Sequence, residues 1–438
     1  MLLIKILSSG FGCIGDGKAF SRCLDIGIEK EGTLIFTKVK ELNYTQYINI
    51  LAIVYAFVIP LSRAGISILT ALLFFLWILD GNFKKKIIYL RNNNVIRVIG
   101  LFIIFNIISL IWTDYLYEAL HYIKRYWYLA PILILATSLQ KEYIPKVLSS
   151  FILGMFVSEV ISYGVFFELW SFSHASVENP SPFMHHIEYS VFLAFTGLIL
   201  LGRIFTEKEM KYKVLYIFFF TTVSGNLFLT AGRTGQLAFV IGLFILALIS
   251  FKNKLKALLV SLVLSTIIIG IAFNLSTTFH DRIIMGKNNL VNVVENASYC
   301  TSLGGRVGAW IISKDMIKEN PILGVGIIDN MKDFHSIIDN KYPEMKCMHQ
   351  NFMHIHNQFL EVFTQMGLIG LFIFISIFYM IVRLPIDESQ YKNIKYIYVT
   401  ILMFSFIPEV LFHRQFSMAL FALVIGLLLA QNRIENEI

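Results

Sequence analysis

The chain has 438 residues, of which 56% are hydrophobic and only 15% are charged, and its net charge at pH 7 is +8. A soluble domain carries about 25% charged residues, so this composition excludes a soluble globular protein. The positive balance does not indicate nucleic-acid binding, because the basic residues lie in short loops between apolar stretches, where they orient membrane spans.

The apolar residues fall in blocks that are long enough to cross a bilayer as helices. We therefore predict an all-α polytopic membrane protein with about twelve transmembrane helices. A long polar segment separates the ninth span from the tenth. The expected spans are residues 47–59, 64–79, 95–112, 127–139, 147–170, 189–205, 214–230, 234–251, 255–273, 359–382, 394–412 and 416–430.

Lysine and arginine are unevenly divided between the two sets of loops that connect these spans. Among the short loops, one set holds most of them, and the alternate set holds only Arg63, Lys124, Arg125, Arg233 and Arg414. The positive-inside rule places the richer set, and with it both termini, in the cytoplasm. The membrane part is then 45–273 and 356–430, and the polar segment 274–355 is a large outer loop with amphipathic helices.

Residues 1–44 are expected to form a cytoplasmic N-terminal extension, and residues 431–438 a cytoplasmic tail. Gly10, Gly12, Gly15 and Gly17 crowd together in the extension. Neither a strand pattern nor a Gly-Lys-Ser/Thr sequence accompanies them, so a flexible tail is favoured over a phosphate-binding loop.

Two arginines on the outer face are candidates for binding an anion. Arg233 stands in a tight break between two apolar spans, with Gly232 and Gly235 beside it. An arginine near membrane depth is costly and marks a functional site by default, although one that only reaches to the interface is the alternative. Arg306 precedes an amphipathic pattern and is expected at the N-terminal end of that helix, where an anion is favoured. A plain surface arginine fits Arg306 equally well.

His356 and Asn357 lie where the polar segment turns into an apolar span. A neutral imidazole accepts a proton near pH 7, so His356 is the candidate general base. Asn357 is expected to hold the tautomer of this ring or to bind a sugar hydroxyl. His185 and His186 form a second outer cluster, which serves either as an acceptor-binding patch or for interfacial packing.

A metal site is the less favoured interpretation of the same segment. Cys347, His349, His354 and His356 lie within ten residues, and zinc takes such ligands, but their spacing matches no standard template. Cys347 also has another use, because Cys300 lies on the same, oxidising side of the membrane. A disulfide between these two cysteines and a pair of free thiols both fit the sequence.

Several segments together resemble the bacterial O-antigen ligases, over roughly residues 45–430. They are the Leu-Thr-Ala-Gly-Arg-Thr-Gly run at 229–235, Gly305-Arg306 with Trp310, the Asn-Pro-Ile-Leu-Gly-Val-Gly run at 320–326, and His-Asn-Gln-Phe-Leu-Glu at 356–361 with Gly367 and Gly370. The resemblance implies a helical bundle of the GT-C type with a large periplasmic loop. It also implies that Arg233, Arg306 and His356 are the key residues.

The activity implied by the resemblance is a step of lipopolysaccharide biosynthesis in the bacterial inner membrane. A glycan passes from undecaprenyl diphosphate to a lipid A–core oligosaccharide on the periplasmic face, without a metal ion or other cofactor and with inversion. O-antigen polymerases and protein O-oligosaccharyltransferases carry related motifs and use the same donor class. A transporter or flippase for an anionic lipid is the alternative of another class, although it would place its ionisable groups near mid-membrane.

Overall fold

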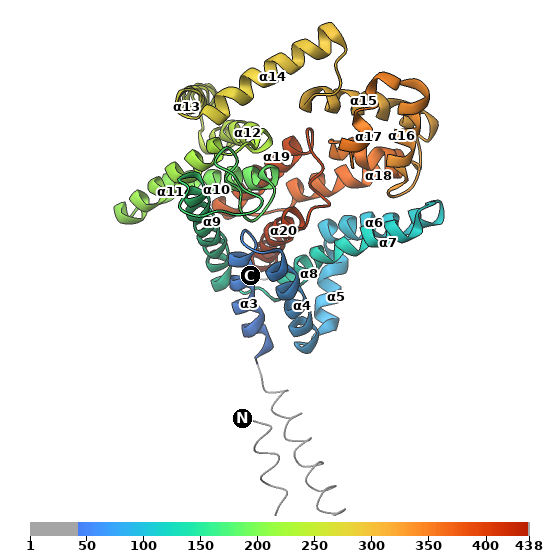
Figure 1. Ribbon diagram of the computed structural model, residues 1–438. Coiled ribbons are helices and arrows are strands. Elements are labelled where there is room, and N and C mark those ends of the chain that lie inside the picture. The colour runs from blue at the N-terminus through green and yellow to red at the C-terminus, as the bar shows by residue number, and fades with distance from the viewer. Residues whose placement is uncertain (1–42, 437–438) are drawn as a thin grey trace, which may run out of the picture.

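The computed structural model describes residues 43–436, and these fold into helices without a β-strand (Figure 1). The predicted N-terminal extension lies almost entirely outside the described residues. The α-helices are α3 (Tyr44–Val58), α4 (Arg63–Leu79), α5 (Phe83–Asn92), α6 (Asn94–Ile108), α7 (Leu116–Lys124), α8 (Ala130–Ser138), α9 (Ile144–Phe166), α10 (His186–Thr206), α11 (Met210–Leu229), α12 (Arg233–Ser250), α13 (Lys254–Leu275), α14 (Thr277–Asn296), α15 (Ser302–Glu319), α16 (Asp329–Lys341), α17 (Met348–Asn351), α18 (Gln358–Arg383), α19 (Ser389–Ser405) and α20 (Gln415–Asn436). Short 3-10 helices are η1 (Ser109–Ile111), η2 (Arg125–Leu129), η3 (Lys141–Tyr143) and η4 (Pro343–Met345).

The prediction of an all-helical polytopic membrane protein is confirmed, and each predicted span overlaps a helix. By length and hydropathy, eight of the described helices can cross a membrane, or nine if the bent pair α4–α5 counts as one span. The helices α3, α8 and α19 have only 15, 9 and 17 residues. The count of about twelve therefore stays a prediction. The basic segment that follows α4 forms the helix α5, which turns away from α4 by 116°.

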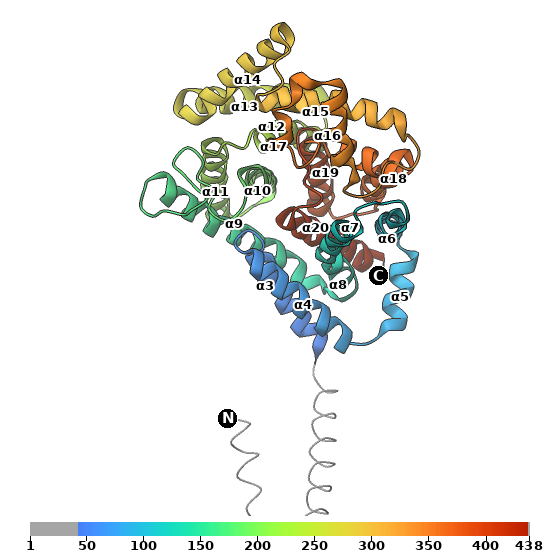
Figure 2. The same ribbon diagram turned by 45° about the vertical axis from the view of Figure 1, so that its right-hand side comes forward.

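The helices α10 and α20 form the centre of the molecule, and other apolar helices surround them (Figures 1 and 2). In the apolar stretch of α20, 89% of the residues are buried, and in that of α10, 78% are. The corresponding shares are only 17% for α13 and 22% for α11. Helices this apolar and this exposed face lipid, because water would not tolerate so large an apolar surface.

Close contact between α10 and α12 explains the two glycines that flank Arg233. A Cβ on Gly232 would lie 2.3 Å from the Ser190 Cβ, and one on Gly235 would lie 2.1 Å from the Ser190 carbonyl carbon. The Ser190 hydroxyl also accepts a hydrogen bond of 3.1 Å from the Gly235 amide. The two glycines therefore allow the close helix packing that fixes Arg233 as the first residue of α12.

The helix α18 is broken at Gly367, and the segment that follows α15 forms hydrogen bonds with the backbone groups on both sides of the break. Gly367 has φ 62°, so the helical hydrogen bonds cannot continue through it. The amides of Val325 and Gly326 donate to the carbonyls of Thr364 and Gln365, at 3.0 and 2.9 Å. In return, the Leu368 amide donates to the carbonyl of Pro321, which satisfies a further backbone group at the break. The 320–326 run thus anchors the outer segment to α18.

Replacing Gly367 by alanine is expected to destabilise the protein by on the order of 3 kcal/mol. The new Cβ would lie 2.2 Å from the Ile322 carbonyl carbon, and the alanine would have to adopt a positive φ. Both the clash and the backbone strain can be relieved only if the 320–326 run moves away from α18. The midpoint of thermal unfolding in detergent measures the effect. Gly100→Ala is the matched control, because a Cβ there meets nothing within 4 Å on α6. Equal midpoints for the two variants would contradict the anchoring role.

The outer segment, residues 276–357, forms a small unit with its own core at the end of the molecule opposite α3–α5 (Figures 1 and 2). Cys300 and Cys347 form a disulfide in this unit, with a Cα–Cα distance of 5.8 Å. The bond joins the start of α15 to the start of α17 and so brings the Arg306 helix near the His356 segment. The core is made by Ala309, Ile312, Met316, Phe334, Ile338, Met345, Met348 and Ile355.

Protein taken from oxidising membranes is expected to yield the linked Cys300–Cys347 peptides. The closed loop spans 47 residues, and in the chain-entropy model such a bond stabilises the fold by on the order of 4 kcal/mol. Mass spectrometry of non-reduced, alkylated peptides checks the bond. Two alkylated thiols at these positions would rule it out, and reduction is expected to lower the unfolding midpoint of the wild type but not of the Cys300→Ser/Cys347→Ser variant.

Candidate active site

His356 lies in the short connection between α17 and α18 and has an unusual backbone. Its φ is 52°, which few residues other than glycine adopt and which persists only where the surroundings enforce it. On the C-terminal side, the Asn357 side-chain oxygen caps α18 by accepting from the amides of Phe359 and Leu360. The oxygen of Asn357 is thus used to cap the helix, and binding of a sugar hydroxyl by its amide group stays a prediction.

A buried carboxylate holds the segment just before His356. Glu361 Oε2 accepts the Ile355 amide at 2.9 Å, and Glu361 Oε1 accepts from the side chains of Asn330 at 3.2 Å and Gln365 at 2.9 Å. These bonds join α16, α18 and the His356 connection at one point. The strained conformation of His356 is thereby fixed from its N-terminal side.

The loop between α19 and α20, residues 406–414, brings a second buried carboxylate, Glu409, against His356. The Gln358 amide donates to the Phe406 carbonyl, and the Gln358 side-chain oxygen accepts the Phe412 amide, both at 2.8 Å. Two bonds from one residue thus clamp this loop to the start of α18. The predicted span 394–412 is wrong at its C-terminal end, because α19 stops at Ser405.

Glu409 is fully buried and contacts four side chains that carry or accept positive charge. Its Oε2 atom lies 3.3 Å from His356 Nδ1 and 3.6 Å from an Arg306 guanidinium nitrogen. Its Oε1 atom lies 3.4 Å from His354 Nε2 and 3.1 Å from an Arg414 nitrogen. Glu409 is not among the residues predicted from the sequence. The signal that could have identified it was an acidic residue inside an apolar run, because a charged side chain at membrane depth is costly and usually marks a functional site.

Glu409 remains ionised throughout the neutral range. Burial raises the pKa of this carboxyl group, but the hydrogen bond from His356 and the positive charge of Arg414 outweigh burial and lower the pKa to about 2. Burial, followed by the charge of His356, lowers the pKa of His354 to about 3, so His354 is neutral. A neutral His354 accepts the His356 amide at Nδ1 and donates to Glu409 from Nε2.

The two arginines named from the sequence meet at Ser302, the first residue of α15. The Ser302 hydroxyl accepts from Arg233 at 3.2 Å and from Arg306 at 3.1 Å. Arg306 also donates to the carbonyls of Ser302 and Pro408, at 2.8 and 3.0 Å. The helix α15 begins at Ser302, so Arg306 lies within its first two turns.

The arrangement therefore brings Arg306 and His356 to the same carboxylate oxygen, and Arg233 to Arg306 through Ser302. Because the carboxylate faces Nδ1, it favours the tautomer in which Nδ1 carries the proton and Nε2 is free to accept one. The Phe352 ring packs edge-on against the His356 ring, with centroids 4.9 Å apart, and limits its rotation. Two guanidinium groups beside a free imidazole nitrogen can bind an anionic leaving group and accept a proton from a nucleophile.

The metal cluster considered from the sequence does not assemble as such. Cys347 is in the disulfide, and His349 pairs with Asp339 at 3.3 Å. In the described part of the chain, His354, His356 and Glu409 are close enough to share an ion. Arg306 and Arg414 already contact the same carboxylate, so a divalent cation would meet two fixed positive charges there.

His185 and His186 lie apart from this cluster, at the start of α10. Their rings are 4.1 Å apart, and His185 caps the helix by accepting the Ile187 amide at 3.4 Å. They line a hollow of about 520 Å³ together with Arg63, His174, Asn179, Ser181, Pro182, Phe183 and Met184. Binding of an acceptor there stays a prediction.

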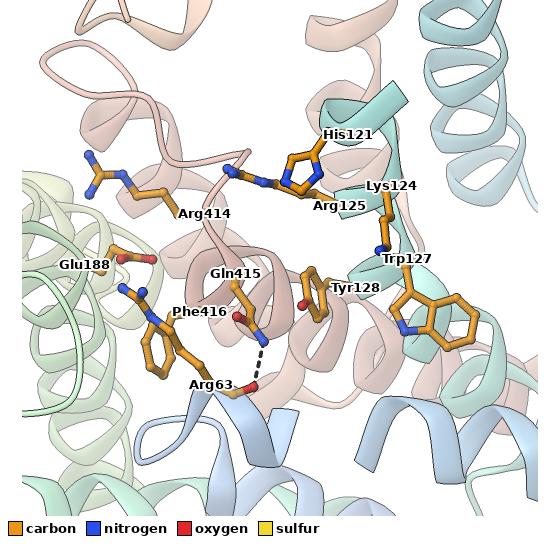
Figure 3. Close-up of a pocket in the computed structure, with 10 residues that line it drawn as sticks. All are labelled: Arg63, His121, Lys124, Arg125, Trp127, Tyr128, Glu188, Arg414, Gln415 and Phe416. Atoms are coloured by element: carbon orange, nitrogen blue, oxygen red, sulfur yellow. Dashed lines mark hydrogen bonds between the residues drawn. The ribbon is translucent and has the colours of Figure 1, made fainter. Parts of the chain in front are cut away.

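A neighbouring hollow of about 460 Å³ shares Arg63 with the first and is strongly basic (Figure 3). We call it the basic pocket. Arg414, which contacts Glu409, forms one side of it. Its lining comes from α4, α7, η2 and the starts of α10 and α20, and consists of Arg63, His121, Lys124, Arg125, Trp127, Tyr128, Glu188, Arg414, Gln415 and Phe416.

Comparison with known proteins supports the resemblance that the motifs carry. Residues 217–375 match a family model described as O-antigen ligase. This range contains Arg233, Arg306 and His356 but not Glu409. An uncharacterised protein of Haemophilus influenzae is 28% identical over 231 residues, which are 50% of this chain and 56% of that protein. The chain thus spans about half the length of this curated relative, and the resemblance to the O-antigen ligase family is confirmed.

Proposed function

From this family match, which indicates a membrane glycosyl transfer of the O-antigen ligase or polymerase kind, we propose that the protein is an O-antigen ligase. It transfers a glycan from undecaprenyl diphosphate to a hydroxyl group of a lipid A–core oligosaccharide. The observation that carries the proposal is the shared Oε2 atom of Glu409, which places Arg306 and His356 at one point while Ser302 joins Arg233 to Arg306.

The donor's diphosphate is the leaving group, and negative charge grows on it as the bond to the sugar breaks. Arg233 and Arg306 bind this diphosphate and stabilise the growing charge. Ser302, which accepts from both arginines, is a neutral partner that a phosphate oxygen can replace without leaving a buried charge unpaired. The start of α15 adds backbone amides that favour the same anion.

His356 Nε2 takes the proton from the acceptor hydroxyl as that oxygen attacks the anomeric carbon. The carboxylate of Glu409 stabilises the imidazolium that results and holds the ring in its tautomer, so Glu409 is a positioning residue. The hydroxyl attacks from the face opposite the diphosphate, which inverts the anomeric configuration. The proton on His356 leaves to solvent or to the diphosphate, and the site is restored.

The site lies on the periplasmic face of the inner membrane, and both termini are cytoplasmic. The support is the distribution of basic residues, because the short loops on the side of Arg233 and Arg414 are poor in lysine and arginine relative to the short loops of the other side. This face is also the one on which an oxidising environment permits the Cys300–Cys347 bond.

Reconstitution tests the function directly. The purified protein is incubated with undecaprenyl-diphosphate glycan and lipid A–core, and the products are separated by gel and mass. Glycosylated lipid A–core supports the ligase. A lengthened polyprenyl-linked glycan without acceptor would make the protein a polymerase, and glycosylation of an added protein acceptor would make it an oligosaccharyltransferase. Movement of the donor across vesicles without any new bond would indicate a flippase.

We expect EDTA to leave the rate of transfer unchanged, within about twofold. The two arginines supply the charge that a metal ion supplies elsewhere, and the His354–His356–Glu409 cluster already holds two guanidinium groups. The check is the initial rate after dialysis against EDTA, with and without added zinc, magnesium or manganese. Activity that is lost on chelation and restored by one of these ions would overturn the metal-free mechanism.

A further inference from the structure

The basic pocket has more positive charge than its own carboxylate can balance. It contains Arg63, Lys124, Arg125 and Arg414, against the single carboxylate of Glu188. Arg414 is matched by Glu409 at 3.1 Å, which leaves three cations in the pocket facing one buried acid. In Figure 3 these side chains surround the hollow from opposite sides.

Most of these cations lack strong partners within the part of the chain that the structure describes. The Arg63 guanidinium lies over the Phe416 ring, with its centre 5.5 Å from the ring centroid, and donates no hydrogen bond to a described residue. Lys124 has neither an ion pair nor a hydrogen bond there, and Arg125 makes one long bond of 3.4 Å to the His413 carbonyl. Glu188 instead accepts from the Ser417 amide and hydroxyl. The donors that face the hollow are therefore available to a ligand.

We propose that the basic pocket binds a phosphate group carried by the acceptor glycolipid. A phosphate offers several oxygens and up to two negative charges, which suits guanidinium and ammonium groups that converge from separate helices. A carboxylate would engage fewer of them. This inference rests on the proposed function, since it assumes that an acceptor lipid is bound beside His356.

The position of the pocket explains why its ligand belongs to the acceptor. Arg414 lies between the pocket and the catalytic cluster, and it contacts Glu409 on the Oε1 side, whereas Arg306 and His356 contact Oε2. The donor diphosphate is assigned to Arg233 and Arg306, on the far side of that carboxylate. A phosphate anchored in the basic pocket would hold a nearby sugar hydroxyl toward the free nitrogen of His356.

The test compares lipid A–core that carries its phosphates with the same lipid after enzymatic dephosphorylation, in a neutral detergent. Wild-type protein is expected to bind the phosphorylated form about tenfold more tightly. Lys124→Gln and Arg63→Gln are each expected to lose most of this preference. Both side chains are exposed and lack hydrogen-bonded partners, so the variants should fold, which the unfolding midpoint verifies. Lys314→Gln, which removes the same charge from an exposed site on α15, is the control that should keep the preference.

Steady-state kinetics distinguish an acceptor-phosphate site from a donor site and from a site for a bulk lipid headgroup. The variants are expected to raise KM about tenfold for the phosphorylated acceptor only, with kcat and the donor KM unchanged. A raised donor KM, or an equal effect with dephosphorylated acceptor, would overturn the inference. Competition by phosphatidylglycerol that equals that of lipid A–core would assign the pocket to a bulk lipid headgroup and overturn it too. If binding keeps its phosphate preference but no transfer is seen, the ligase proposal fails and the pocket assignment stands.

Discussion

The His356→Ala variant is expected to lose transfer by a factor of about 10²–10⁴, the range that a positioned general base contributes. His356 contacts Glu409 through Nδ1, so its Nε2 faces away from that carboxylate, and removal of the ring leaves the acceptor hydroxyl without the proposed proton acceptor. The initial rate with saturating donor and acceptor measures the loss. The effect should fall on kcat, because His356 is proposed to act in the transition state.

Two further variants separate catalysis from structure. His349 lies in the same segment but pairs with Asp339 instead of Glu409. The His349→Ala variant is therefore expected to keep full activity. Glu409→Gln keeps a hydrogen-bond acceptor but removes the charge that favours the correct tautomer and stabilises the imidazolium. It should lower kcat strongly and alter the pH profile, while donor binding to Arg233 persists. Wild-type rates in His356→Ala would eliminate the general-base role.

The second large effect is expected from Arg306→Lys and Arg233→Lys, each of which should reduce transfer by about 10²-fold or more. Lysine keeps the positive charge but loses the planar fork that binds two phosphate oxygens at once. At Arg306 the change also removes the bonds to Ser302 and Pro408 that orient the guanidinium. Both kcat and the donor KM should change, because the diphosphate is held before and during bond cleavage.

Arg91→Lys provides the matched control, since Arg91 is exposed on α5 and takes no part in the site. It should leave the rate unchanged. Rates close to wild type in both Arg233→Lys and Arg306→Lys would mean that these residues supply only general positive charge. The unfolding midpoints of the variants show whether a loss of rate comes from the site or from the fold.

Much of the candidate site was visible in the sequence because membrane physics makes isolated polar residues conspicuous. Arg233 stands between two apolar blocks and His356 at the edge of another, and burying such groups in lipid is costly enough to mark them. The apolar blocks also predicted the positions of the helices. The length of the blocks was less informative for the number of spans, because α3, α8 and α19 are short and partly enclosed by other helices.

Glu409 was missed for a physical reason that concerns all buried polar groups. Two residues that contact its carboxylate, His356 and Arg306, lie 53 and 103 residues earlier in the chain (409 − 356 and 409 − 306). No local pattern records such a contact. The glycines beside Arg233 show the same limit, because the packing that requires them is against Ser190 on another helix.

The sequence by itself determined the membrane class, the helical composition, the separate polar segment and the individual candidates Arg233, Arg306 and His356, because these follow from local hydropathy and from the cost of charge in lipid. Only the tertiary structure decided which of them meet. Gln358 holds the 406–414 loop against α18, and the 320–326 run bonds to the backbone of α18 at Gly367. Ser302 then contacts both arginines, and Glu409 contacts Arg306 and His356. Contacts between distant segments depend on how the helices pack, and helix packing is set by the whole chain rather than by any one stretch of it.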